Sequence, residues 1–309
     1  MRFLSDSALE RLRDGAEAPD LAGTRYRLLE RIARGGMGVV YAAEDENLRR
    51  RVALKVLDIP GTDGDLANRL IREARVLAAL EHPGIVPVHD VGTLADGRVF
   101  YTMKFVEGRR LDQYIDSVAS IPDRLRIFLR ICDAVAFAHA RGVLHRDLKP
   151  ENVMVGAFGE VLVLDWGLAK VLADAGDPVP ARRTGESAVL GTPGFMSPEQ
   201  RGGESATVDA RTDVYSLGAM LGWMAGRDSP RPLQAISRKA MAARREDRYP
   251  DVLSLAADVT RFLDGEAVSA DAESVLRRLG RVAKRHRVAL GIVLAYLAGR
   301  ALILLFTGR

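Results

Sequence analysis

The residues best suited to chemistry lie in one strongly charged segment near the middle of the chain. Five of the eight residues from His145 to Asn152 are ionisable, although the segment stands between two apolar stretches. Asp165 comes thirteen residues after Asn152, at the end of a predicted strand over 161–164. Carboxylate and amide oxygens are the ligands that Mg²⁺, a hard cation, prefers. Together with Asp147, these two residues predict a magnesium site. His145 is interpreted as a structural residue, because no set of four His or Cys ligands indicates zinc.

Two features upstream point to phosphate chemistry. Lys55 interrupts an apolar strand, and a buried lysine requires a partner. Glu73 lies on a face of the next predicted helix that can point toward the sheet. The glycine-rich segment 34–38 could close over phosphates, because glycines let backbone N–H groups approach an anion. The plain alternatives are a hairpin turn, a lysine that reaches outward from an edge strand, and a solvated glutamate.

The elements that must position these residues fall into two groups. Alternating and helical apolar patterns predict a strand-rich first part and a helical second part, with a cleft between them. This is an α+β, two-lobe arrangement. The first part has predicted strands at 26–32, 39–42, 51–57, 85–91 and 98–106 and a helix at 66–80; the second has helices at 111–118, 124–141, 213–225, 233–243 and 252–263 and strands at 153–155 and 161–164.

Composition narrows the class of protein. The chain has 309 residues, of which 48% are hydrophobic and 28% charged, so wholesale disorder is excluded. Its one cysteine, Cys132, excludes an intrachain disulfide framework. Residues 277–309 carry eight basic and no acidic side chains, although the whole chain is only +4. The net positive charge of the chain therefore comes from the tail. There it points to an anionic membrane surface rather than to nucleic acid.

Seven motifs in order give the chain a resemblance to the bacterial eukaryotic-type Ser/Thr protein kinases. They are IARGGMGVVY (32–41), VALKVL (52–57), REARVLAALEHPGIV (72–86), HRDLKPENV (145–153), LDWGLAK (164–170), GTPGFMSPEQ (191–200) and TDVYSLGAM (212–220). The resemblance implies a kinase domain over 26–265, with an N-lobe at 26–106 and a C-lobe at 107–265. It also implies transfer of the γ-phosphate of ATP to Ser or Thr hydroxyls of proteins, with autophosphorylation, in bacterial signalling.

The resemblance assigns catalytic and metal-binding roles to the charged segment. Asp147 would accept or orient the proton of the substrate hydroxyl, and Lys149 would neutralise the γ-phosphate as it transfers. Asn152 and Asp165 would bind Mg²⁺, with Mn²⁺ as an alternative.

The resemblance also implies an ATP site. Lys55 would hold the α- and β-phosphates and pair with Glu73. The other implied ATP-binding residues are Ala33, Arg34, Gly35, Gly36, Met37, Gly38 and Val40 around the loop, with Ala53, Met103, Lys104 and Val106 around the adenine.

Further residues are assigned to regulation and structure. The segment from Asp165 to Glu199 corresponds to the activation segment, and Arg146 would gather a phosphate placed on it. The candidate residues on this segment are Thr184, Ser187 and the substrate-facing Thr192; the structural residues are Arg146, Asp213 and the pair Glu199 and Arg248.

The chain departs from the family pattern at three single residues and in one stretch. Ser197 conservatively replaces the Ala of Ala-Pro-Glu. Ala33 replaces the first glycine of the loop, and Trp166 replaces the Phe of Asp-Phe-Gly. After Gly222, only residues 223–232 separate two predicted helices where family members carry a longer insert that helps to dock substrates. A pseudokinase, acting as a nucleotide-binding scaffold, and a small-molecule kinase are therefore the alternative hypotheses. The complete set of charged site residues argues against the first, and the protein-kinase activation segment argues against the second.

The two ends of the chain differ from the kinase-like part. Residues 1–25 are predicted to be a flexible leader, and 266–287 a basic juxtamembrane segment. Residues 288–306 have the length of a membrane-spanning helix, with Arg300 able to snorkel; a buried C-terminal helix or a truncated end are the alternatives. We expect a cytoplasmic kinase domain anchored to the cell membrane by a single-pass helix, with protein substrates, a homodimer for autophosphorylation and no nucleic acid partner.

Overall fold

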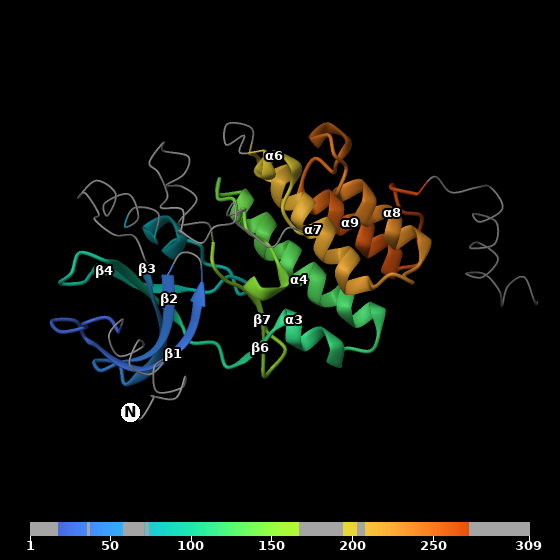
Figure 1. Cartoon of the computed structure of the whole chain (residues 1–309). Helices are drawn as coiled ribbons and strands as arrows, with labels where there is room; N and C mark the ends of the chain where they lie inside the picture. Colours follow the sequence, from blue (N-terminus) through green and yellow to red (C-terminus); the bar gives the residue numbers. More distant parts are fainter. Residues whose placement is uncertain are drawn as a thin grey trace, which may run out of the picture.

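The computed structural model has two lobes that lie side by side, one built on a β-sheet and one on helices (Figure 1). It describes residues 18–35, 38–57, 71, 74–166, 194–202 and 208–271. This arrangement confirms the α+β, two-lobe prediction.

The first lobe is an antiparallel sheet with strand order β1-β2-β3-β5-β4. Its strands are β1 (Tyr26–Gly35), β2 (Gly38–Asp45), β3 (Arg50–Leu57), β4 (Val88–Thr93) and β5 (Val99–Lys104). The predicted strand at 85–91 begins later than expected, while the helix predicted at 66–80 falls largely outside the described residues, of which 74–78 are helical.

The central strand β3 is covered on both faces. Val52, Leu54 and Val56 pack into a smaller apolar cluster on one face, whereas Ala53 and Leu57 join the main core on the other. Because side chains alternate along a strand, Lys55 lies on the same face as the second pair. The lysine is thereby directed toward the core that the two lobes share.

The first residue of β2 lies in close backbone contact with β3. Gly38 has a φ of 150°, and a Cβ on it would lie 2.1 Å from the carbonyl oxygen of Val56. Only glycine permits this close approach, so Gly38 lets the start of β2 lie directly against β3.

The second lobe is helical, with a small sheet in the order β6-β7-β8 at its border with the first (Figure 1). Its helices are α3 (Leu111–Tyr114), η1 (Ile115–Ser117), α4 (Ile121–His139), η2 (Pro150–Asn152), α6 (Pro198–Arg201), α7 (Ala210–Ala225), α8 (Arg231–Ala240), η4 (Arg245–Asp247) and α9 (Val252–Leu263); its strands are β6 (Gly108–Arg110), β7 (Val153–Gly156) and β8 (Val161–Val163).

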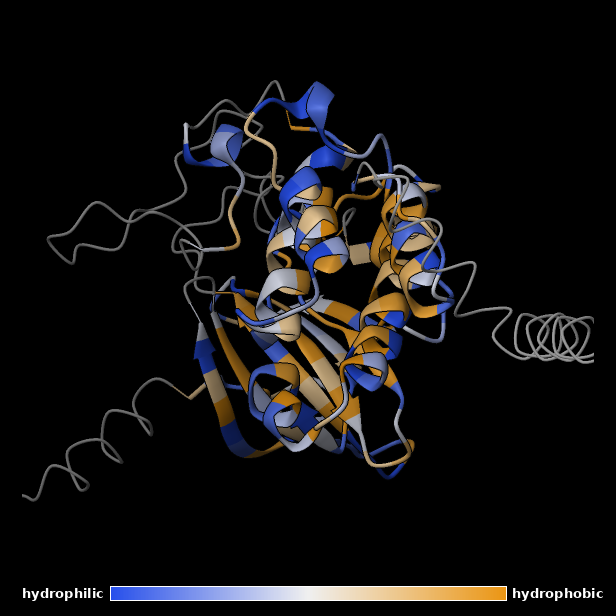
Figure 2. Cartoon of the chain, turned by 90° about the vertical axis from the view of Figure 1, so that its right-hand side faces the viewer, coloured by the Kyte–Doolittle hydropathy of each residue, from blue (hydrophilic) through white to orange (hydrophobic). Residues whose placement is uncertain are grey.

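Helix α7 is the centre of this lobe. It is buried along most of its length and packs against α4, α8 and α9, and Figure 2 shows orange, apolar residues along these helices. A Cβ on Gly218 would lie 2.5 Å from the Cβ of Ala240 on α8, so the two helices are in direct contact. Only residues 226–230 connect α7 to α8, which confirms the shortened region predicted after Gly222.

Backbone hydrogen bonds join the two lobes behind the site. Val163 on β8 donates to the carbonyl of Gly84 at 2.8 Å, and Val86 donates to the carbonyl of Val163 at 3.2 Å. One continuous apolar core then runs from the inner face of the first sheet into the helical lobe. These hydrogen bonds therefore fix the position of β8, and of the segment that follows it, relative to the first lobe.

Within the described ranges, no helix is long and apolar enough to span a bilayer. The candidate span at 288–306 and the basic segment before it lie outside those ranges, as does most of the predicted leader.

Candidate active site

An ion pair joins the two lobes. The Nζ of Lys55, on β3, lies 2.7 Å from the Oδ1 of Asp165, which follows β8. The lysine side chain is 11% exposed and the aspartate side chain 35% exposed. Asp165 has a φ of 52°, a left-handed conformation that aspartate tolerates better than most residues. This backbone turn directs its carboxylate at the lysine.

Both members of the pair are charged at neutral pH. Burial opposes the charge of Lys55, but its interactions with Tyr101 and Asp165 outweigh that effect and raise the pKa of the lysine. Burial likewise opposes ionisation of Asp165, but the nearby Lys55 ammonium holds the pKa of that carboxyl below its usual value. The pair therefore presents one cation and one anion side by side.

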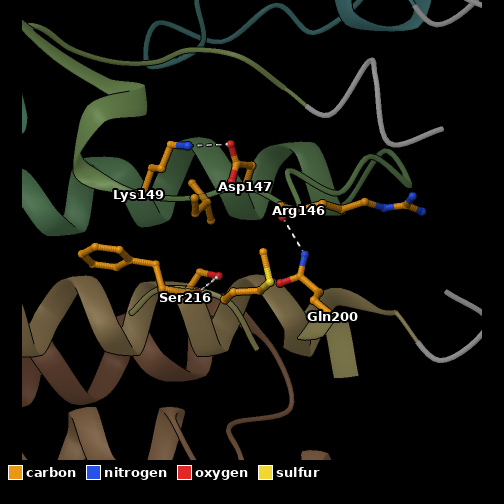
Figure 3. Close-up of a pocket in the computed structure, with 8 residues that line it drawn as sticks. Arg146, Asp147, Lys149, Gln200 and Ser216 are labelled. Atoms are coloured by element: carbon orange, nitrogen blue, oxygen red, sulfur yellow. Dashed lines mark hydrogen bonds and ion pairs between the residues drawn. The ribbon is translucent and has the colours of Figure 1, made fainter. Parts of the chain in front are cut away.

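Three residues of the charged segment contact one another. The Nζ of Lys149 lies 3.0 Å from the Oδ2 of Asp147, and both side chains point the same way in Figure 3. The Nδ2 of Asn152 donates to the carbonyl oxygen of Asp147 at 2.8 Å and to its Oδ2 at 3.2 Å. Because its nitrogen faces Asp147, the carbonyl oxygen of Asn152 is the atom suited to a cation.

A buried carboxylate on α7 holds the backbone of the charged segment. Asp213 is fully buried and accepts hydrogen bonds from the backbone nitrogens of His145 and Arg146, each at 2.8 Å. Its Oδ2 also lies 2.7 Å from the Nε2 of His139. Burial opposes ionisation of Asp213, but these hydrogen bonds keep its pKa below the usual value. Arg146 has a φ of 64°, so Asp213 stabilises a bend that extended backbone would not make.

His145 links the charged segment to the chain before Asp165. Its Nε2 lies 2.8 Å from the carbonyl oxygen of Leu164, and its Nδ1 accepts from the backbone nitrogen of Asp147 at 3.3 Å. Burial lowers the pKa of His145, so the ring is neutral, with Nε2 as the donor. The ring packs at 4.8 Å from Trp166. These contacts agree with the structural role predicted for this residue.

A second cation–carboxylate pair lies deep in the helical lobe. Arg248 donates to both carboxylate oxygens of Glu199, at 2.8 and 2.9 Å, and Thr212 donates to the same carboxylate at 3.0 Å. Burial opposes ionisation of Glu199, but the Arg248 hydrogen bonds lower its pKa to about 2. The predicted partners are therefore in contact, and they join α6 to the chain before α9.

The remaining ATP-site predictions surround the cleft face of the sheet. Val40 pairs with Lys55 across β2 and β3, and Ala53 pairs with Met103 across β3 and β5. Strand β5 ends at Lys104, so Val106 lies beyond the sheet ladder. Ala33, Arg34 and Gly35 lie at the end of β1, and Gly38 at the start of β2.

Several predicted residues cannot be placed. The loop residues Gly36 and Met37, the lysine partner Glu73, and the activation-segment residues Thr184, Ser187 and Thr192 lie outside the described residues.

Two residues of the site were missed from the sequence. Tyr101 lies directly opposite Lys55 in the β3–β5 register, which the alternation of the predicted strand at 98–106 could have indicated. Gln200, on α6, donates through Nε2 to the carbonyl oxygen of Arg146 at 2.6 Å and lines the pocket beside Asp147 (Figure 3). No local pattern indicates the second contact, since it joins segments far apart in the chain.

The family model of the protein kinase domain matches residues 26–295. The chain belongs to the protein kinase family. It is 33% identical over 303 residues to the serine/threonine-protein kinase PknD of Protochlamydia amoebophila, a match that covers 78% of this chain and 30% of that one. PknD of Chlamydia felis is 35% identical over 294 residues, with 78% and 31% covered. The chain spans about three tenths of the length of these curated relatives.

The kinase fold is also found among solved structures. The kinase domain of Mycobacterium tuberculosis PknI superposes with a TM-score of 0.59 at 27% identity, and the match covers 79% of this chain and 98% of that one. A second crystal structure of the same domain superposes with a TM-score of 0.58, with 78% and 96% covered.

Proposed function

We propose that this kinase transfers the γ-phosphate of ATP to Ser or Thr hydroxyls of protein substrates. The observation that carries the proposal is the ion pair between Lys55 from one lobe and Asp165 from the other. Asn152 ties Asp147 to this region, because it donates to the carbonyl oxygen of Asp147 and accepts from the backbone nitrogen of Leu164, which precedes Asp165. The relatives named Ser/Thr-protein kinase PknD support the choice of substrate class.

ATP would bind beneath the first sheet. Lys55 supplies a buried positive charge for the α- and β-phosphates, and the backbone of residues 33–38 covers them. Ala53 and Met103 form a small apolar patch for the adenine, and the peptide groups from Lys104 to Val106 supply its hydrogen bonds.

The donor set of the site fits a magnesium ion. One carboxylate, Asp165, and one amide oxygen, on Asn152, leave the remaining positions to phosphate oxygens and water, which is how Mg²⁺ is commonly bound at phosphate sites. Mn²⁺ accepts the same oxygen ligands. The ion would neutralise negative charge on the phosphates. Among the described residues, no cluster of three or more His, Cys, Asp or Glu indicates a different metal site.

Asp147 and Lys149 are proposed to act on the two reacting groups. The Asp147 carboxylate orients the substrate hydroxyl and accepts its proton, while the Lys149 ammonium balances charge on the phosphate in transfer. Because the Lys149 Nζ lies 3.0 Å from the Asp147 Oδ2, both side chains can act on the same phosphate transfer. Catalysis of this kind depends on positioning and charge stabilisation more than on covalent chemistry.

The short connection after α7 bears on the pseudokinase alternative. It removes length from a region where family members dock substrates, but Lys55, Asp147 and Asp165 all belong to other segments of the chain. We therefore expect it to affect which proteins are phosphorylated rather than whether phosphate is transferred.

Transfer of labelled phosphate tests the proposal. The full chain is incubated with Mg²⁺, γ-labelled ATP and a basic protein, beside Asp147→Asn. We expect label on Ser or Thr of the kinase and of the added protein, and a loss of at least about a hundredfold in the variant. Equal labelling would contradict the role of Asp147, and nucleotide binding without transfer by the wild type would favour the pseudokinase.

Regulation and location are further proposals from the sequence. Thr184, Ser187 and Thr192 are candidate phosphorylation sites that Arg146 would recognise, in a homodimer that autophosphorylates. The basic tail would hold the kinase domain on the cytoplasmic side of an anionic cell membrane rather than on nucleic acid. Cell fractionation of the full chain beside one ending at Arg287 tests the anchor, and equal solubility would remove it.

A further inference from the structure

The tyrosine opposite the cleft lysine is a polar residue that the proposed mechanism does not use. Tyr101 on β5 pairs with Lys55 on β3, so the two side chains leave the sheet on the same face. Tyr101 is 4% exposed and belongs to the main apolar core. A buried phenol in such surroundings needs a hydrogen-bond partner.

The cation opposite Tyr101 on this face is Lys55. The two residues are direct cross-strand partners, and each affects the pKa of the other. Because an ammonium can only donate, the phenol oxygen is the atom suited to accept from it. Lys55 also donates to Asp165 at 2.7 Å.

Among the described residues, two neighbours of the lysine, Asp165 and Tyr101, differ in how firmly they are held. Asp165 follows a strand end in a left-handed conformation and is partly exposed, and the proposed function requires its carboxylate to bind a metal ion. Tyr101 lies within a paired strand and is enclosed by the core. Burial raises the pKa of Tyr101 to about 12, so the phenol is neutral at neutral pH.

A neutral partner suits a lysine that must attract phosphates. A carboxylate cancels the charge of the ammonium, whereas a hydroxyl fixes its position and leaves the charge intact. Since Asp165 would also hold a metal ion, the Tyr101 hydroxyl is the neighbour of Lys55 that this ion would not engage.

We propose that Tyr101 is a positioning residue for ATP, which holds the Lys55 ammonium at the phosphates through its hydroxyl. The inference rests on the proposed function and adds a residue to its ATP site. It predicts that loss of the hydroxyl weakens the binding of ATP but does not change the binding of the protein substrate.

The test compares two tyrosines that each lose one buried hydroxyl from the same sheet. Tyr101→Phe removes the contact with Lys55. Tyr26→Phe is the matched control, because the Tyr26 hydroxyl contacts Thr102 and Asp90 on the other face. In the full chain we expect Tyr101→Phe to raise the KM for ATP about tenfold. The KM for the protein substrate should change by less than about twofold, and Tyr26→Phe should change neither constant by more.

A double-variant cycle separates positioning from packing. If the hydroxyl acts through the lysine, Tyr101→Phe weakens binding of Mg²⁺–ATP in the wild type and has no further effect in Lys55→Met. An unchanged ATP affinity in Tyr101→Phe, or the same loss in both backgrounds, would overturn the inference. Thermal unfolding of each variant shows that it is folded.

Failure of the proposed function would be visible separately. If the wild type binds nucleotide without transferring phosphate, the kinase proposal fails while the binding cycle still decides on Tyr101. If the wild type binds no nucleotide, both fail.

Discussion

Two cation–carboxylate pairs in this kinase have similar chemistry and opposite surroundings. Lys55 and Asp165 meet between the lobes, where the carboxylate is one-third exposed and contacts the lysine at 2.7 Å. Arg248 and Glu199 meet inside the helical lobe, where a bidentate contact is supported by Thr212. The first pair can exchange partners, whereas the second cannot do so without exposing a buried charge.

The contrast shows how one fold separates catalysis from support. A buried pair that loses one member leaves an uncompensated charge, which costs far more than the pair contributes. A pair at the mouth of a cleft can release its carboxylate to a metal ion and its ammonium to a phosphate, because both replacement partners are also charged. We therefore expect changes at the inner pair to act on stability and changes at the cleft pair to act on activity.

Removal of the buried guanidinium should have the largest effect on stability. Arg248→Met leaves Glu199 without its partner and frees the carbonyls of Ala242 and Ala243, which Arg248 also contacts. We expect the free energy of unfolding to fall by about 3–5 kcal/mol, measured by denaturant titration. The control Arg244→Met breaks an exposed pair with Glu246 and should leave the midpoint unchanged. Equal losses in both variants would contradict the comparison.

Acid should weaken the inner pair over a defined range of pH. The pKa of Glu199 is lowered from 4.5 to about 2 by Arg248, against the effect of burial. A lowered carboxyl pKa adds stability that is complete above pH 4.5 and is lost as the pH falls through about 2. Denaturant midpoints should therefore fall over this range, and Glu199→Gln should show a shallower fall. Parallel curves for the two proteins would show that other groups control acid unfolding.

The cleft pair should contribute least to stability. Asp165→Asn keeps the shape of the side chain, and asparagine tolerates the same left-handed backbone. Its amide oxygen can still accept from Lys55. Because Lys55 keeps this acceptor, we expect the free energy of unfolding to fall by less than it does in Arg248→Met, measured by denaturant titration of both variants. A loss as large as that of Arg248→Met would remove the distinction between the pairs.

Much of the site could be predicted because its residues stand in short motifs with local patterns. The positions of Lys55 within an apolar strand and of Asp165 at a strand end were enough to predict both as site residues. The structure brings the two together across 110 residues of chain. The start of α4 was placed three residues late, although Ser120 caps the helix by accepting from the backbone of Asp123 and Pro122 lies in its first turn.

The contacts that escaped prediction depend on how distant segments pack. The sequence does not show that His139 at the end of α4 meets Asp213, or that Gln200 reaches the carbonyl of Arg146. Tyr101 is an ordinary residue of a predicted strand. Only the register between β3 and β5 shows that it lies opposite Lys55. Such contacts follow from tertiary structure, since any one of these side chains has several equally suitable partners in the chain.

Phosphate transfer by Asp165→Asn tests the central claim most directly, because Asp165 is both the partner of Lys55 and the proposed metal ligand. With Mg²⁺, labelled ATP and a basic protein, the account predicts that the wild type labels Ser or Thr. The folded variant should label at a rate reduced by at least about a hundredfold. Transfer at the wild-type rate by the variant would contradict the account.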